Sequence, residues 1–445
     1  MKQTNLKKAI GFWDSVALVI GGTIGVGIFR TPSEICRYVS DPGWVLFAWI
    51  LGGVIAFVGT LCFCELSAAL PETGGMYVYL KRAYGPWAGF LFGWSEVALI
   101  SAASIASISY AFGEYSRNLF PYPPGFEKAI AITMLWFLTL VNIAGIHYGK
   151  WLQNIVSIGK ALALSSIIFL GLLLGKGSLG NFASSFPAPP VTQFLPQLGL
   201  AMVPILWTYG GWHESTYVAG EFKETDRELP LSLLVAASII IFFYLVINTV
   251  YLYLFPAAQI ATRKLIAGDV MDIIFGPWGK TAITGVILTC IFGVLNTVIL
   301  VRGRVPFAVG KDHSIFRWFG TSHAKYETPD RSLLLNAVWA SVLVLWGNFN
   351  QLLFLAAAAV WLFFAATGLA VFVIRKRFRE KKRPFSAWGH PWTTLLFVAA
   401  SLWIFFNTAI FSPRETAFGF SLIALGLPIY WLSRRMDAKR ASLTR

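Results

Sequence analysis

Two glycine-rich stretches set the architecture that this sequence predicts: Gly21-Gly22-Thr23-Ile24-Gly25-Val26-Gly27 and Trp207-Thr208-Tyr209-Gly210-Gly211-Trp212. Each lies in the middle of a long apolar run. A helix in lipid keeps its backbone polar groups bonded internally, so a glycine cluster at mid-helix indicates a break whose freed groups meet something polar. The spacing of Gly21 and Gly25 also suits close packing of unbroken helices, which is the alternative explanation.

The sequence around these stretches is that of a membrane protein. Of its 445 residues, 56% are hydrophobic and 13% are charged, and the mean hydropathy is +0.65, which is too apolar for soluble globular domains. We predict an all-α integral membrane protein with twelve transmembrane helices of about 20 residues or more. The apolar runs that carry this prediction are 11–36, 43–70, 85–117, 128–147, 153–175, 198–220, 231–255, 278–303, 332–347, 352–374, 391–411 and 416–433.

The basic residues predict how the chain is oriented. Twelve crossings leave 26 of the 36 lysines and arginines on the side of both termini, including six between Arg302 and Arg331, and 8 on the other side. Arg30 and Lys160 remain within the runs. Because cytoplasmic loops carry the excess of basic residues, we predict a multi-pass protein of the plasma (inner) membrane with both termini cytoplasmic. The net charge of +15 then needs no nucleic acid as partner.

The two glycine-rich stretches occupy matching places in two halves of similar length. Runs one to five cover 11–175 and runs six to ten cover 198–375, and each half begins with an interrupted helix. Paired interruptions point to the central site of a secondary transporter. Half-helix N-termini attract an anion and unwound carbonyls accept from an ammonium group, so the site suits a zwitterion. A cytoplasmic arm (1–10), two further helices (391–433) and a cytoplasmic tail (434–445) complete the expected organisation.

Several further motifs resemble one known family along nearly the whole chain. The chain is similar to members of the amino acid/polyamine/organocation transporter superfamily, and within it to the L-amino acid transporter branch. The most specific motif is the Pro-x-x-Gly-Gly-x-Tyr run that starts at Pro71. The others are Gly25-Val26-Gly27-Ile28-Phe29, Glu65-Leu66, Gly85-Pro86, Gly93-Trp94, Tyr209-Gly210-Gly211-Trp212, Phe292-Gly293 with Asn296, and Gly310-Lys311-Asp312.

The resemblance implies a fold and the first part of a binding site. The fold is the LeuT-type inverted repeat of five plus five helices, with interrupted helices 1 and 6 and two extra helices, which alternates access around a midplane site. Gly25, Val26 and Gly27 would offer backbone N–H groups to a substrate carboxylate. Val26 departs from the small or hydroxylated residue common at the middle of this Gly-x-Gly turn, which bears on side-chain specificity.

The resemblance also assigns the partners of the substrate amino group. Thr23, Trp207 and Thr208 would offer their carbonyls to it. Trp207 aligns with the aromatic gate that covers the bound substrate, and Gly210 leaves room beside it.

Lys160 lies inside the fifth run, where a lysine is costly. It could bridge to carbonyls of the broken first helix in place of a bound cation, or lose its proton when dry, or extend to the membrane surface. In the family this position matches a lysine that replaces a sodium ion, so sodium dependence is disfavoured. The segment Val301-Arg302-Gly303 supports this weakly, because it lacks the adjacent hydroxyls that sodium requires.

Other polar residues give weaker signals. His213 and Glu214, just past the second break, could couple protons to transport or could form a hydrogen-bonded pair. Glu65, Glu96 and Glu114 are interpreted as hydrogen-bond partners in packing or gating. The Cys62-Phe63-Cys64 segment suits helix packing better than a metal site, and neither a metal nor a cofactor is implied.

The function that this sequence predicts is secondary active transport of neutral L-amino acids by sodium-independent exchange. The nearest alternative is a proton-coupled symporter that uses Lys160. A polytopic membrane enzyme would need a cluster of nucleophile and base or of metal ligands, and the five histidines are scattered. A channel would need a selectivity filter.

Eukaryotic members of the family join a heavy chain through an external cysteine. The loop between Arg117 and Lys128 has none, so no disulfide-linked heavy chain is expected.

Overall fold

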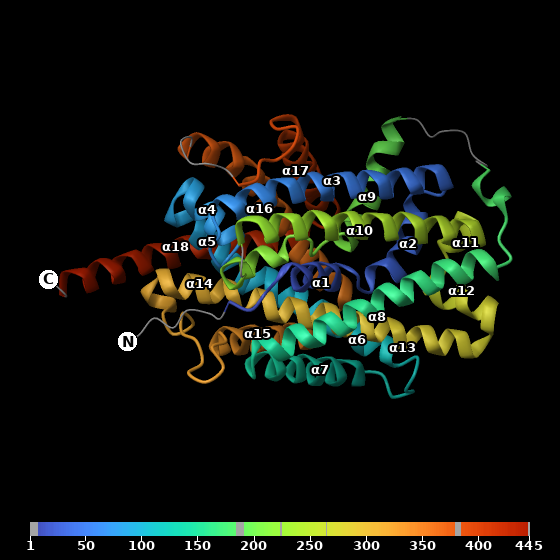
Figure 1. The fold of residues 1–445 in the computed structure, drawn as a ribbon, viewed down its shortest axis with the longest axis horizontal. Coiled ribbons are helices and arrows are strands. Elements are labelled where there is room, and N and C mark those ends of the chain that lie inside the picture. The colour runs from blue at the N-terminus through green and yellow to red at the C-terminus, as the bar shows by residue number, and fades with distance from the viewer. Residues whose placement is uncertain (1–7, 184–190, 223–224, 264, 379–383, 444–445) are drawn as a thin grey trace.

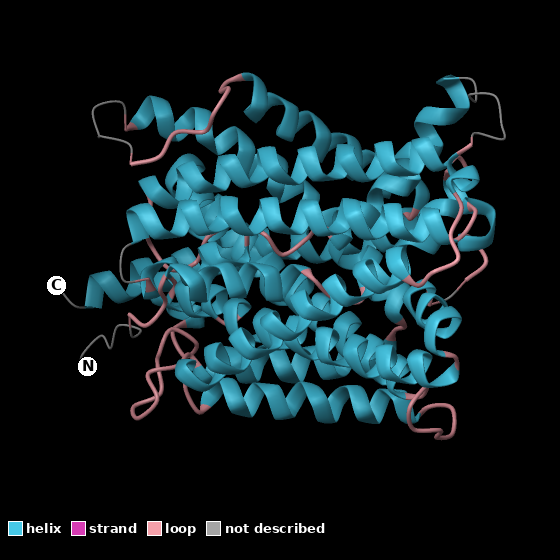
Figure 2. Ribbon diagram, turned by 45° about the vertical axis from the view of Figure 1, so that its right-hand side comes forward, coloured by secondary structure: helices cyan, strands magenta, loops and turns pink. Residues whose placement is uncertain are grey.

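The fold is known from a computed structural model that describes residues 8–183, 191–222, 225–263, 265–378 and 384–443. These residues form helices and connecting loops, and their single extended pairing is the bridge between Ile10 and Phe222. Figure 2 shows the helices running roughly along one direction, with most loops at two opposite ends and short non-helical segments inside the bundle. The predicted all-α class is confirmed.

Nine helical spans in the described ranges are long and apolar enough to cross a membrane. Proline starts several of them at a position that needs no N–H donor, and Asp41 caps the first by accepting from Gly43 N at 2.9 Å. The nine are α3 (Pro42–Ala69), α5 (Pro86–Ser95) continued by η1 (Glu96–Ile100) and α6 (Ser101–Ser116), α7 (Phe126–Ile143), α8 (Ile146–Leu173), α10 (Thr225–Leu254), α13 (Pro277–Arg302) continued by α14 (Arg304–Asp312), α16 (Phe349–Arg377), α17 (Trp392–Phe411) and α18 (Pro413–Leu443).

Both predicted interruptions are present. The first run forms α1 (Phe12–Thr23) and α2 (Gly27–Tyr38), which are bent by 43° and together make a tenth span. In the second, α9 (Val191–Thr208) ends at Thr208, and the chain turns through Gly211 at φ +105° before the 3-10 helix η3 (Glu214–Glu221). Glycine is needed at this turn because other residues rarely adopt such a φ. The two stretches are therefore not continuous rods.

In the described part of the chain, fewer than the predicted twelve helices are long enough to cross a membrane. Each predicted run overlaps a helix, but α15 (Asp330–Trp346) has 17 residues, and the apolar part of α9 is Phe194–Thr208. At about 1.5 Å per residue, 17 residues extend roughly 26 Å, less than a hydrocarbon core of about 30 Å. Twelve crossings therefore remain a prediction. Five short elements in loop regions complete the list: α4 (Met76–Tyr84), η2 (Leu179–Phe182), α11 (Ala257–Ile260), α12 (Ile266–Phe275) and η4 (Ser314–Phe316).

The broken helix α1 lies at the centre of the bundle. It packs against α8, α10 and α13, while α2 packs against α9. In Figure 1, α3 and α10 run side by side next to this centre, and α7 lies at its opposite edge. Outward-facing side chains on the outer helices are large and apolar, such as Phe137 of α7 and Ile158 of α8, which are 53% and 63% exposed. Such a surface suits contact with lipid.

The basic residues in the helices correct one step of the topology argument. Arg302 and Arg304 are 7% and 2% exposed and pair with glutamates, so they are not loop charges. Without these two, the expected cytoplasmic side still holds 24 of the 26 basic residues counted there. The start of α1 and the end of α18 lie at the same end of the bundle (Figure 1), as an even number of crossings requires.

The terminal segments are described in part. Of the predicted cytoplasmic arm (1–10), residues 1–7 lie outside the described residues, and Ala9 N and Ile10 N donate to Glu221 O at 2.9 and 3.0 Å. Of the predicted tail (434–445), residues 434–443 continue helix α18, and 444–445 lie outside the described residues.

Candidate functional site

The freed carbonyls of the two broken helices meet at one side chain. The hydroxyl of Tyr244, from α10, lies 3.0 Å from Thr23 O at the end of α1 and 3.1 Å from Thr208 O at the end of α9. A phenol has one proton and can donate to one carbonyl at a time. One of the two carbonyls therefore remains able to accept from another donor. Sequence analysis missed Tyr244, because it is one of several polar side chains in its run and belongs to no motif that sets it apart.

The start of α2 lies close to both neighbouring helices. A Cβ atom on Gly25 would be 2.7 Å from Val294 of α13, and one on Gly27 would be 2.7 Å from Thr208 Oγ1. Glycine at these positions allows the backbone to approach both helices. The first N–H groups of a helix have no acceptor within it, so this end of α2 is a place where an anion is favoured.

One cavity of about 120 Å³ lies between the two breaks. All seven residues that the sequence predicted as substrate contacts line it: Thr23, Gly25, Val26, Gly27, Trp207, Thr208 and Gly210. Further walls come from Ser104 and Ser107 of α6, Arg302 of α13, and Trp361 and Phe364 of α16. Segments about 180 residues apart in sequence therefore line one cavity, and the binding roles of the seven residues stay predictions.

An aromatic and cationic stack separates this cavity from a larger cleft. Trp207 lines the cavity and meets the ring of Phe349 edge to face, with centroids 5.5 Å apart. The guanidinium of Arg30 lies 4.6 Å from the same Phe349 ring and pairs with Glu114 at 3.2 Å. Arg30 and Glu114 line the cleft, which measures about 910 Å³. Trp207 thus lies where a gate between the two spaces would be.

Lys160 reaches the first break. Its Nζ donates to Gly21 O at 2.6 Å, and the side chain is buried, so the alternative of a lysine extending to the membrane surface is wrong. In a continuous helix the carbonyl of Gly21 would accept from the N–H of Gly25. Because α1 ends at Thr23, that bond is replaced by one from the Lys160 ammonium. The bond ties α8 to the broken helix.

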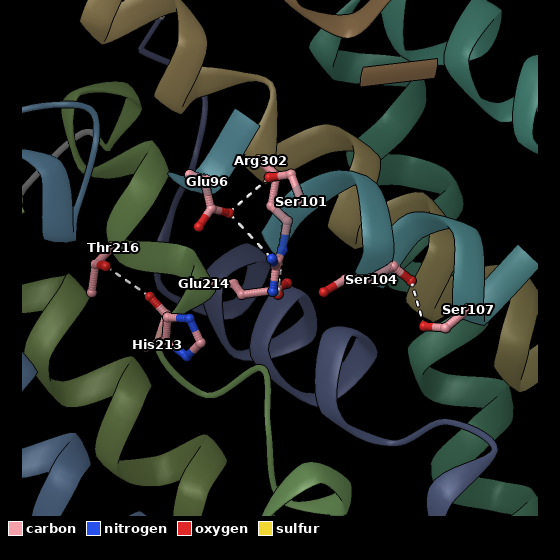
Figure 3. A network of polar contacts seen from close by, with 8 residues as sticks. All are labelled: Glu96, Ser101, Ser104, Ser107, His213, Glu214, Thr216 and Arg302. Atoms are coloured by element: carbon pink, nitrogen blue, oxygen red, sulfur yellow. Dashed lines mark hydrogen bonds and ion pairs between the residues drawn. The ribbon is translucent and has the colours of Figure 1, made fainter. Parts of the chain in front are cut away.

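Glu214 pairs with an arginine and not with His213. Arg302 donates to Glu214 Oε1 from Nε at 3.1 Å and from Nη2 at 2.8 Å, and to Glu96 Oε1 from Nη1 at 3.1 Å (Figure 3). The ring of His213 packs among Phe63, Trp212 and Phe364, and its Nδ1 has no hydrogen-bond partner among the described residues. The idea of a hydrogen-bonded pair between His213 and Glu214 is therefore wrong.

The three other glutamates are hydrogen-bond partners, as predicted. Glu65 binds Arg375, Glu96 binds Arg302, and Glu114 binds Arg30. Within the described ranges, no three His, Cys, Asp or Glu side chains gather closely enough to hold a metal ion. The Sγ atoms of Cys62 and Cys64 contact different partners, Thr394 and Pro230.

Two interrupted helices around a cavity inside an apolar helical bundle define a secondary transporter. The chain belongs to the amino acid permease family, whose sequence model matches residues 10–433. It is a multi-pass membrane transporter and not an enzyme. The predicted resemblance to the amino acid/polyamine/organocation superfamily, and to its L-amino acid transporter branch, is confirmed.

Three relatives illustrate this membership. The serine/threonine exchanger SteT of Bacillus subtilis is 30% identical over 440 residues, which cover 98% of this chain and 99% of SteT. The human b(0,+)-type amino acid transporter 1 is 29% identical over 388 residues, covering 86% and 79% of the two chains. The human Asc-type amino acid transporter 1 is 28% identical over 439 residues, covering 96% and 82%.

Proposed function

We propose that this permease exchanges neutral L-amino acids across the plasma (inner) membrane by alternating access, without sodium. The observation that carries the proposal is the cavity between the two breaks, whose lining includes Thr23 and Thr208 at the helix ends and Gly27 at the start of α2. A zwitterion needs both kinds of partner, an anion site and an ammonium site. The names of the three relatives, all exchangers or transporters of amino acids, support the same reading.

The proposed contacts follow the two charges of the substrate. Its carboxylate would accept from the backbone N–H groups of Gly25, Val26 and Gly27. Its amino group would donate to the carbonyls of Thr23, Trp207 and Thr208. The Thr23 and Thr208 carbonyls also lie within hydrogen-bond distance of the Tyr244 hydroxyl, so the substrate would compete with it there. Trp207 would cover the bound molecule, with Gly210 beside it. The cavity of about 120 Å³ suits side chains of small to medium size.

Sodium independence is supported by the position of Lys160. Its ammonium already binds a carbonyl freed by the break, where a bound cation would otherwise be needed. We propose that the halves 11–175 and 198–375 form an inverted repeat that moves around this centre. Both termini would be cytoplasmic. No disulfide-linked partner is proposed, because the four cysteines are buried and unpaired in the described residues.

Counterflow in proteoliposomes tests exchange against its nearest alternative. Vesicles loaded with unlabelled amino acid should take up labelled neutral amino acid several-fold faster than empty vesicles, and replacing sodium by choline should leave the rate unchanged. The alternative, proton-coupled symport with Lys160 as the proton carrier, would be favoured by a different result. An imposed pH gradient would then drive uptake into empty vesicles, and internal substrate would not stimulate uptake. Strict sodium dependence would contradict the proposal.

A further inference from the structure

Three charged side chains meet beside the cavity and have no role in the proposed recognition of the substrate. Glu96, Glu214 and Arg302 come from different parts of the chain, and each is less than a tenth exposed. Both carboxylates use Oε1 to accept from the same guanidinium, and Glu96 Oε1 also accepts from Ser101 Oγ at 2.7 Å. We call these three residues the Glu–Arg–Glu triad (Figure 3).

The two glutamates of the triad come from irregular elements, and the arginine comes from a helix end. Glu96 begins the π-helical turn η1, which interrupts the span between α5 and α6. Glu214 follows the second break and lines the cavity, and Arg302 is the last residue of α13. π-Helical turns inside α-helices are frequently found at functional sites. The triad therefore connects the second break to the α5–η1–α6 span and to α13, and it contacts the space in which substrate is proposed to bind.

The triad contains one carboxylate more than its arginine can neutralise. With both glutamates ionised its net charge is −1, inside a helical bundle surrounded by lipid. The second oxygens, Glu96 Oε2 and Glu214 Oε2, are buried and have no hydrogen-bond partner in the described part of the chain. An unpartnered charge of this kind is costly, and two carboxylates held at one site cannot both ionise without a large penalty.

The other groups around the triad do not remove this charge. His213 and Tyr217 face it from the second break, and Tyr79 faces Tyr217 from α4. Tyrosine is neutral near pH 7, and a protonated His213 would be repelled by Arg302. The other buried cations among the described residues, Lys160 and Arg304, bind Gly21 O and Glu221 instead. The remaining way to neutralise the triad without additional space is to bind a proton from water.

We propose that Glu96 and Glu214 share one exchangeable proton, which is held while the cavity is closed and released to water when the cavity opens. Water supplies the proton as hydronium, one carboxylate becomes a neutral carboxylic acid, and the reverse transfer restores the ion. This inference rests on the proposed transport function, because it links the proton to opening of the same cavity. It differs from proton carriage by Lys160, which the alternative symport mechanism requires.

A direction for the pH dependence follows from the charge. Closing the cavity removes water from the triad, and it is easier to dehydrate a neutral triad than one with a charge of −1. Exchange should therefore be fast at low pH and slow as the proton is lost. Between about pH 5.5 and about pH 8 we expect the rate to fall by several-fold or more, because the protonated fraction of a single site falls about tenfold for each pH unit above its midpoint.

Amide variants test the proposal. Glu96→Gln and Glu214→Gln each leave one carboxylate on one arginine, and either should abolish the pH dependence of exchange, so that the ratio of rates at the two pH values becomes close to one. Two variants are used in case one fails to fold. Glu72→Gln is the control, because Glu72 forms a one-to-one pair with Arg82, and it should keep the wild-type ratio. The proposal would be overturned if both amide variants kept the wild-type ratio of rates while Lys160→Ala lost it.

A second measurement does not depend on transport. Infrared difference spectra of the purified full chain between the two pH values should contain the carbonyl stretch of a buried carboxylic acid, and this band should disappear in Glu96→Gln and Glu214→Gln but persist in Glu72→Gln. If wild-type vesicles show no exchange at any pH while this band is present, the proposed function fails and the proton site stands. If the band is unchanged in both amide variants, the proton site fails. The proposal would also be overturned if the wild type lacks this band and transports a cationic amino acid, and if Glu214→Gln loses that transport. Glu214 would then belong to a site for the cationic side chain of a substrate.

Discussion

Lys160 provides a prediction at the scale of a single residue. Lys160→Ala removes the ammonium from Gly21 O and leaves this carbonyl buried without a donor, whereas Lys81→Ala removes a side chain that is 32% exposed and paired with Asp312. A lost bond to a charged group costs about 1.5–3 kcal/mol, so exchange by Lys160→Ala should fall roughly tenfold or more. Lys81→Ala should change it less.

Initial rates of exchange in proteoliposomes, normalised to the amount of reconstituted protein, measure this difference. Equal activity of the two lysine variants would show that the bond to Gly21 does not support transport.

The second break provides a prediction at the scale of an element. Gly211 has a φ of +105°, and a Cβ atom there would lie 2.9 Å from the carbonyl carbon and oxygen of Gly22. Gly211→Ala should therefore strain its own turn and push the two breaks apart, with a loss of about 1–3 kcal/mol of stability and a large loss of exchange.

Gly285→Ala in α13 is the matched control, because nothing lies within 4 Å of a Cβ atom built there. It should be neutral or stabilising by up to about 1 kcal/mol, since alanine suits a helix better than glycine. Thermal unfolding followed by tryptophan fluorescence compares the two. A midpoint for Gly211→Ala as high as that of Gly285→Ala would mean that the two breaks do not need this close contact.

At the scale of the whole molecule, Glu65 connects distant parts of the bundle. From α3 it accepts from Arg375 of α16 at 2.7 and 2.6 Å, and from Ala387 N ahead of α17 at 2.8 Å. Glu65→Gln removes the carboxylate charge that accepts from Arg375 and should cost about 3 kcal/mol. In Glu72→Gln the lost pair is 49% exposed on both sides, so the loss should stay below about 1 kcal/mol.

The apparent melting temperatures of these two variants in the same detergent measure the contrast. Similar small shifts for both would indicate that the Glu65 contacts are not needed to hold α3, α16 and α17 together.

Part of the site could be predicted because its signals are local. The two glycine clusters and Lys160 stand out within apolar runs, and lipid allows few exceptions to a continuous apolar helix. For Arg302 the local sequence is misleading. This residue lies at the end of the apolar run 278–303, where the sequence groups it with the next cytoplasmic loop, but its partners Glu96 and Glu214 lie 206 and 88 residues away. Tyr244 was missed for the same reason, since its acceptors belong to two other helices.

The sequence by itself determined the helical class, the positions of both interruptions and the family, because hydrophobic length and glycine clusters act within a few turns of one helix. The tertiary structure alone decided which carbonyl Lys160 binds, that Tyr244 joins the two broken ends, and that two carboxylates converge on one arginine. These contacts depend on how helices distant in sequence pack together. Hydrogen bonds and charges act over a few ångströms in space, and the order of residues along the chain does not specify those distances.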